Sequence, residues 1–115
     1  MPQYLFQVAY TSGSWAKQVR DQGNVLDRIQ PLLKACSGRV DSCFYAFGEY
    51  DLVLIADFPS PEEAASFSLA ATAGGAVKTI QTTSLLTVEQ GIAAMRRAAE
   101  AGKHYVPPVD TPVHH

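Results

Sequence analysis

The sequence predicts one α+β domain in which a four-stranded antiparallel sheet carries helices on one face. Segments 3–11, 39–47, 50–58 and 77–86 are rich in β-branched and aromatic residues, as strands are. Segments with helical spacing separate the first strand from the second and the third from the fourth. A chain of 115 residues is long enough for an ordinary core without metal or disulfide support.

The second and third strands are predicted to form a hairpin around Gly48 and Glu49. A two-residue link with glycine first is typical of a type II′ turn, in which that glycine has a positive φ. Phe47 would then face Tyr50, and this register predicts the further opposed pairs Tyr45 with Leu52, Cys43 with Leu54 and Asp41 with Ala56 on the same face. The other face would hold Phe44, Ala46, Asp51, Val53 and Ile55. Both faces are apolar, so we expect helices on one and another subunit on the other.

Composition narrows the class of protein. Charged residues make up 17% of the chain, below the roughly 25% usual for soluble domains, which suggests that a partner covers some surface. A net charge of −2 gives no electrostatic support for binding a phosphate backbone, so no nucleic-acid partner is expected. The absence of a leader pattern and of a long apolar run predicts a cytoplasmic protein with no membrane partner.

The first two helical segments are predicted from their end signals. Ser14 is expected to cap a short helical turn through Gln22, and Asn24 to cap a helix over 25–37. Pro31 lies inside that helix and predicts a kink. Gly38 then fits the left-handed position that follows a helix end.

The later helices have clearer signals. Ser60, Pro61 and the acidic pair that follows predict a helix start, and the helix should run to about residue 73 before Gly74. Thr87 and Gln90 form a capping-box pattern for a third helix to about residue 101. Residues 104–115 contain several prolines and are expected to form an extended tail, either loose or laid along another surface.

This order of elements is the ferredoxin-like βαββαβ arrangement, with an extra C-terminal helix. One face of such a sheet is bare. Two sheets that meet through their bare faces form a dimeric α+β barrel, which would explain the apolar character of both faces of the hairpin. We therefore expect a homodimer or a higher homo-oligomer.

The segment 48–55, the opening residues 1–5 and the threonine-rich fourth strand resemble the GYD domain family, named for its Gly-x-Tyr-Asp signature. The resemblance covers residues 1–89, with 90–103 as an appended helix and 104–115 as the tail. It implies a dimeric α+β barrel and no established activity. The hairpin and 77–86 are also similar, more weakly, to the effector-binding domain of leucine-responsive regulators, where the matching turn and last strand belong to a small-ligand site between subunits. The DNA-binding helices of those regulators are absent from this sequence.

Aromatic and polar residues near the predicted barrel are candidates for a small-molecule pocket. The set is Tyr10, Trp15, Tyr45, Phe47, Tyr50 and His104. The alternative for the aromatic members is an ordinary core or interface role. Gly48, Glu49 and Asp51 are interpreted as structural turn residues, although either carboxylate could instead become a proton acceptor if buried. Asp51 is expected on the face opposite Tyr50, which makes Tyr50 the better ligand candidate.

No metal or cofactor is expected. Cys36 and Cys43 have no metal-ligand or redox spacing and are interpreted as small buried hydrophobic residues. His114 and His115 are either native or the remnant of a purification tag, and they are not counted as ligands. The leading hypothesis is a homo-oligomeric domain that binds a small molecule. The alternatives are a small cofactor-independent enzyme, such as an isomerase or monooxygenase, and a purely structural assembly unit.

Overall fold

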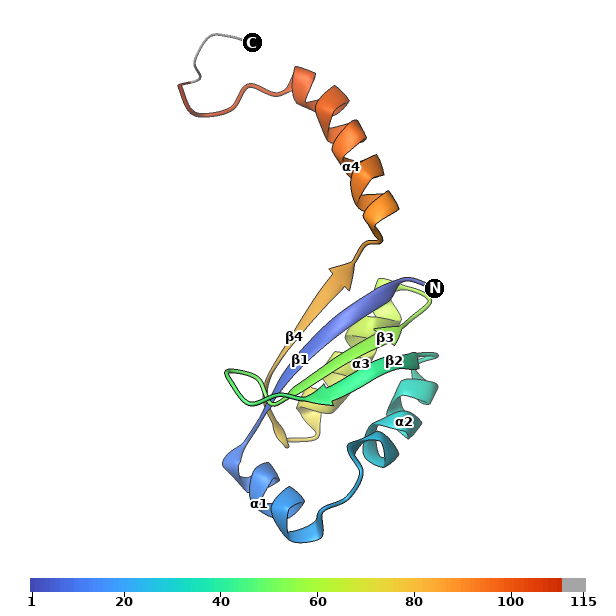
Figure 1. The fold of residues 1–115 in the computed structure, drawn as a ribbon, viewed down its shortest axis with the longest axis vertical. Coiled ribbons are helices and arrows are strands. Elements are labelled where there is room, and N and C mark those ends of the chain that lie inside the picture. The colour runs from blue at the N-terminus through green and yellow to red at the C-terminus, as the bar shows by residue number, and fades with distance from the viewer. Residues whose placement is uncertain (111–115) are drawn as a thin grey trace. The chain divides into compact units, whose positions relative to one another are not determined.

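The computed structural model describes residues 1–110 and contains two compact units, which are described separately (Figure 1). Unit 1 spans Met1–Leu85, and unit 2 begins at Leu86. The elements of unit 1 are β1 (Gln3–Tyr10), α1 (Ser12–Asp21), α2 (Val25–Ala35), β2 (Arg39–Tyr45), β3 (Leu52–Asp57), α3 (Pro61–Ala73) and β4 (Val77–Leu85). Unit 2 contains α4 (Val88–Ala101) and the short 3₁₀ helix η1 (Gly102–His104).

Unit 1 is built on a four-stranded sheet in the order β2-β3-β1-β4, and every neighbouring pair is antiparallel. Its core lies between the sheet and the helices α2 and α3. Phe6 of β1 is fully buried, and its ring lies 5.1 Å from that of Phe67 on α3 and 5.7 Å from that of Phe58. Leu33 of α2 belongs to the same buried cluster. The predicted ferredoxin-like α+β fold is confirmed.

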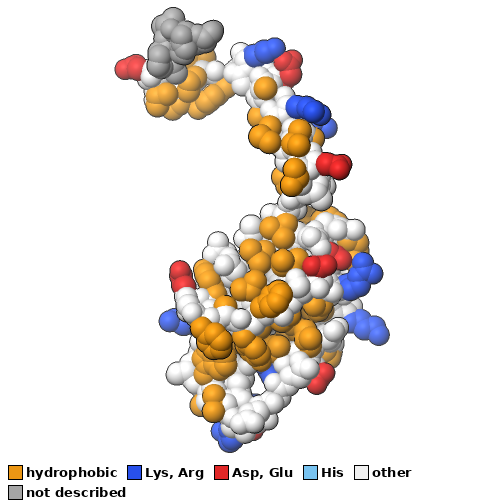
Figure 2. Space-filling model, in the orientation of Figure 1, with side chains coloured by type: hydrophobic (Ala, Val, Ile, Leu, Met, Phe, Trp, Pro, Cys, Tyr) orange, Lys and Arg blue, Asp and Glu red, His pale blue; other side chains and the backbone are white. Residues whose placement is uncertain are grey.

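The opposite face of the sheet carries a second set of side chains. Tyr4, Phe6 and Val8 of β1 are buried against the helices, so strand alternation places Leu5 and Gln7 on the other face. In Figure 1 the strands lie in front of α3, and Figure 2, drawn from the same side, shows hydrophobic side chains gathered over them. Register assigns to this open face Leu5, Gln7, Val53, Ile55, Phe44, Gln81 and Thr83.

The central hairpin differs from the prediction at its turn. The strands end at Tyr45 and resume at Leu52, and the Ala46 N–H donates to the Asp51 carbonyl at 2.8 Å. Within residues 1–110 the glycine with a positive φ is Gly75, so the type II′ turn at Gly48 was wrong. The link is a longer loop because the backbone of Asp51 bonds to β1, where its N–H donates to the Val8 carbonyl at 2.7 Å.

The predicted register is right beside the loop and wrong farther out. Tyr45 lies opposite Leu52 and Cys43 opposite Leu54, as expected. The register shifts between Val40 and Ser42, so that Val40 and not Asp41 pairs with Ala56. Asp41 is the extra residue of this irregularity, and a bulge of this kind cannot be counted outward from a turn.

The ends of the first two helices are only partly as predicted. Asn24 caps α2, and its Oδ1 accepts from the Leu26 N–H at 2.9 Å. Thr11, not Ser14, caps α1, because the Thr11 hydroxyl accepts from the Ser14 N–H. After α2 the left-handed residue is Ser37, with φ 62°, and not Gly38. The kink at Pro31 stays a prediction.

The later helices begin where they were expected to begin. Ser60 stands at the N-cap of α3, but its hydroxyl donates to Glu63 Oε1 instead of accepting a backbone N–H. Thr87 and Gln90 form a complete capping box at α4.

Cys36 and Cys43 are free thiols, and both are partly buried against the core. Across residues 1–110, no helix is long and apolar enough to cross a membrane.

Candidate functional site

A small apolar cavity lies between the sheet and the two helices that cover it. It has a volume of about 100 Å³, and its walls include Val8, Ile29, Leu54 and Phe67. Two of its lining residues carry polar groups, Tyr10 at the end of β1 and Arg28 on α2. An apolar hollow with a few convergent polar groups is the usual form of a small-molecule site.

The Tyr10 phenol and the Arg28 guanidinium set the electrostatics of this cavity. Burial raises the pKa of Tyr10 above its ordinary value of 10.0, and the neighbouring Arg28 guanidinium opposes part of that rise. The phenol therefore stays protonated at neutral pH and can donate a hydrogen bond. The Arg28 Nη2 group donates to Gln18 Oε1 at 2.9 Å, which ties α2 to α1.

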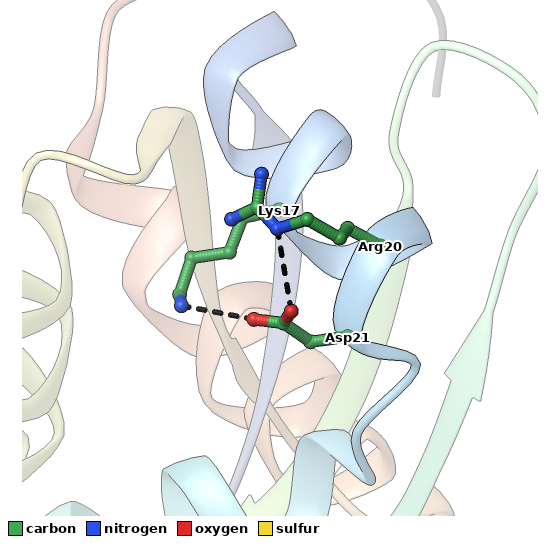
Figure 3. Close-up of polar contacts among 3 residues, drawn as sticks. All are labelled: Lys17, Arg20 and Asp21. Atoms are coloured by element: carbon green, nitrogen blue, oxygen red, sulfur yellow. Dashed lines mark hydrogen bonds and ion pairs between the residues drawn. The ribbon is translucent and has the colours of Figure 1, made fainter.

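Arg28 also lines a polar groove between α1 and the start of α2, with a volume of about 410 Å³. Its other charged side chains include Lys17, Asp21 and Asp27. Lys17 Nζ lies 3.0 Å from Asp21 Oδ2, and Arg20 Nε lies 3.4 Å from Asp21 Oδ1 (Figure 3). The hydrogen bond from Lys17 lowers the pKa of Asp21, so this carboxylate stays ionised, and the basic side chains of Lys17 and Arg20 on the same helix balance its charge. Arg28 is thus the side chain common to the cavity and the groove.

Three of the six residues predicted as ligand candidates lie together. The Trp15 ring stands edge-on to the Tyr10 ring, with centroids 5.5 Å apart, and it lies 6.3 Å from the Tyr45 ring. Tyr45 pairs with the buried Leu52, so this aromatic cluster lies on the helix-covered side of the sheet. Such edge-on aromatic pairs add packing energy beyond the area they bury.

The other three candidates lie elsewhere. The Tyr50 hydroxyl contacts Gln81 Oε1 at 2.7 Å, and Gln81 pairs with Gln7 on the open face. Tyr50 therefore reaches the face opposite Tyr45, contrary to the predicted register. Phe47 stands in the loop with 97% of its surface exposed. His104 is exposed in η1 of unit 2.

Asp51 holds the loop to the first strand. Its Oδ2 accepts from the Tyr10 backbone N–H at 2.9 Å, and Glu49 is exposed in the same loop. This hydrogen bond is the contact expected of a structural turn residue, the first of the two roles considered for Asp51, and not of a free proton acceptor. No group of three or more His, Cys, Asp or Glu side chains in the part of the chain described here could hold a metal ion.

The GYD domain model matches residues 4–95, which is most of the chain. The chain belongs to the GYD domain family. A comparison with curated proteins found no match. Among solved structures, the GYD domain is similar to the crystal structure of FFRP-DM1, with a TM-score of 0.53 and 14% identity over 75% of this chain and 100% of that one. It is also similar to MtbAldR, with a TM-score of 0.51 and 18% identity over 75% of this chain and 52% of that one.

These two likenesses establish the fold. They support the weaker resemblance to the effector-binding domain of leucine-responsive regulators as a likeness of fold and not of role. The GYD domain spans about half of the MtbAldR chain. The Gly-x-Tyr-Asp signature of the present chain supplies two residues with separate contacts. The Tyr50 hydroxyl bonds to Gln81 on the open face, and the Asp51 carboxylate binds the backbone of β1.

Sequence reasoning missed two residues of this GYD domain. Arg28 was overlooked because an arginine beside the apolar stripe of a helix is usually a solvated residue. The available signal was its spacing of three residues from Val25 and four from Leu32, which places all three on one face of the helix. Gln81 could have been found from strand alternation, since it shares a face with Thr79 and Thr83.

Proposed function

We propose that this GYD domain is a homo-oligomeric module that binds a small molecule in the cavity beside Tyr10. The observation that carries the proposal is the pairing of a protonated phenol and a guanidinium with otherwise apolar walls. The apolar part of a ligand would occupy the cavity, and an acceptor group would meet Tyr10 and Arg28. Such an arrangement favours an anion, because both groups donate hydrogen bonds.

The size of the cavity limits the ligand. A dry cavity of roughly 150 Å³ lined by Leu, Ile and Phe is known to take up benzene. This cavity, at about 100 Å³, is smaller and suits a short branched aliphatic group. The ligand class is therefore a short aliphatic carboxylate or a larger molecule that ends in such a group.

Binding can be tested with two probes of matched shape, isobutyrate and isobutanol, by following backbone amide shifts in NMR titrations. Both should shift the amides of Val8 and Ile80, and isobutyrate should bind more tightly. Arg28→Gln should reduce isobutyrate binding to the level of isobutanol. Arg20→Gln removes the same charge from α1 outside the cavity and should leave binding unchanged. No shift at the cavity amides with either probe, or equal effects of the two arginine variants, would contradict the proposal.

The oligomer is proposed to form through the open face of the sheet, with a second copy of the chain as the partner. Phe44 on that face is 64% exposed, and Leu5, Val53 and Ile55 are only partly buried. Leu5, Val53 and Ile55 lie on the two central strands and Phe44 lies on the edge strand β2, and exposed apolar side chains that extend over a sheet face in this way are typical of a homodimer interface. Two such faces together would form the dimeric α+β barrel.

Light scattering after size exclusion tests the oligomer. The wild-type chain should elute as a dimer or larger species, and Phe44→Lys should shift it toward the monomer. Val19→Lys introduces the same charge at an exposed apolar residue of α1 and serves as the control. A wild-type monomer at micromolar concentration would rule out the assembly.

The enzyme alternative has weaker support. It rests on the fold alone, and the Asp51 carboxylate that would act as base already accepts a backbone hydrogen bond. The proposal also includes a cytoplasmic location and the absence of a nucleic-acid partner, and the net charge of −2 supports the second of these.

A further inference from the structure

Helix α4 carries an apolar stripe that no other part of residues 86–110 covers. Val88, Ile92, Met95 and Ala99 follow one another at intervals of four, three and four residues, the spacing of a coiled-coil seam. None of the residues of α4 is buried; Val88 is 80% exposed and Met95 65%. Figure 2 shows hydrophobic side chains gathered along this helix.

The helix is well formed at its start but short. The Thr87 hydroxyl accepts from the Gln90 N–H, and Gln90 Oε1 accepts from the Thr87 N–H, so two backbone donors are satisfied. With 14 residues α4 is about 21 Å long. Helices shorter than about 12–15 residues are marginal in water by themselves, so a helix of this length gains stability from a surface that covers its apolar stripe.

The charged residues beside the apolar stripe indicate which kind of surface covers it. In the seam numbering Val88 and Met95 are d positions, and Ile92 and Ala99 are a positions. The e positions that follow the d residues are Glu89 and Arg96, which have opposite charges. The g positions on the other side are Gly91 and Ala98, which carry no charge. When two copies of one helix pack antiparallel, the e positions of one copy face the e positions of the other. Glu89 of each copy would therefore meet the oppositely charged Arg96 of the other.

We infer that α4 of one chain pairs antiparallel with α4 of a second copy. Ile92 then packs beside Met95 of the second copy, and Val88 beside its Ala99. Glu89 lies near Arg96 of the second copy, and two-fold symmetry repeats that contact at the other end. A parallel pair would set e positions against g positions, and no opposite charges would meet. The pairing is separate from the open face of the sheet, because it uses residues of unit 2 alone.

Charge reversal in the full chain tests the pairing. Arg96→Glu gives a helix with two acidic e positions, and Glu89→Arg gives one with two basic e positions. Each variant should associate about three- to tenfold more weakly than the wild type in sedimentation velocity at low salt, since two attractive contacts become repulsive. An equal mixture of the two variants should recover wild-type association, because every contact across the pair is again opposite in sign.

The matched control is Arg97→Glu, which makes the same charge change at the next residue, on the outer side of the helix. It should leave association unchanged. Equal effects of Arg96→Glu and Arg97→Glu, or a mixture no tighter than its components, would overturn the inference. Persistent dimers that are insensitive to all three variants would point to the sheet face as the sole interface.

Cysteine cross-linking tests the direction without changing charge. Chains with Val88→Cys and chains with Ala99→Cys should form a disulfide with each other under mild oxidation, with the linked residues identified by mass spectrometry. Cross-links between two Val88→Cys chains in preference to the mixed pair would mean a parallel arrangement. The absence of cross-links both in the mixture of the two variants and in the Val88→Cys variant by itself would mean that α4 does not pair with itself.

Discussion

The carboxylate of Asp51 accepts a hydrogen bond from the backbone N–H of Tyr10 at 2.9 Å, joining residues 41 positions apart in the chain. The Asp51 N–H also donates to the Val8 carbonyl on the same strand. One residue of the GYD signature thus fixes the loop 46–51 to β1. It also holds the backbone of the tyrosine that borders the apolar cavity.

Asp51→Ala should therefore destabilise the domain. It leaves the partly buried Tyr10 N–H without its partner, which costs about 1–3 kcal/mol in the free energy of unfolding. Urea unfolding followed by circular dichroism measures the change. Glu49→Ala, in the same loop but exposed, should change stability by less than about 0.5 kcal/mol. Equal stability of the two variants would mean that the carboxylate contributes nothing to the fold.

Two glycines should respond in opposite ways to alanine. A Cβ at Gly38 would lie 2.7 Å from Cζ of the buried Phe58 ring, so Gly38→Ala should cost about 1–3 kcal/mol through overpacking. A Cβ at Gly48 would meet nothing within 4 Å, and the residue has no positive φ. Gly48→Ala should be neutral or stabilise the domain by up to about 1 kcal/mol. Thermal unfolding of both variants gives the comparison, and a larger loss at Gly48 would contradict it.

The hairpin shows what could be predicted from sequence and what could not. Alternation identified both strands and the pairs Tyr45–Leu52 and Cys43–Leu54, because these depend on local pattern. The turn was mispredicted because Asp51 bonds to β1, a partner distant in sequence that no local rule considers. Gly38 was assigned a conformational role for the same reason, since the ring that requires it belongs to Phe58.

The candidate site shows the same difference between contacts that are local in sequence and contacts that depend on tertiary packing. Tyr10 and Trp15 were expected together and are, because only five positions separate them. Tyr50 was placed on the wrong face, since its position followed from the mispredicted turn. Arg28 reaches Tyr10 only through the packing of α2 on the sheet, which the sequence does not specify.

The raised pKa of Tyr10 predicts a loss of stability at alkaline pH. The folded state holds this proton more tightly than the unfolded chain, whose tyrosine titrates near 10.0. Stability is therefore full below pH 10 and falls as pH rises from there through the folded pKa. Tyr10→Phe, which keeps the ring beside Trp15, should remove part of this loss when urea midpoints at pH 8 and pH 11 are compared. The exposed Tyr105→Phe should not, and identical profiles for the two variants would contradict the prediction.

The capping box at the start of α4 should contribute measurably to that helix. Thr87→Ala removes the side-chain acceptor of the Gln90 N–H, and an N-cap loss of this kind costs about 1 kcal/mol. Faster amide hydrogen exchange in the first turn of α4 is the expected signal. Thr72→Ala is the control, because the Thr72 hydroxyl only donates to the Ser68 carbonyl within α3, a bond that adds little to a helix. Since the cap belongs to unit 2, exchange in β1 and β3 should stay unchanged in Thr87→Ala, and faster exchange there would mean that the variant acts on the whole fold.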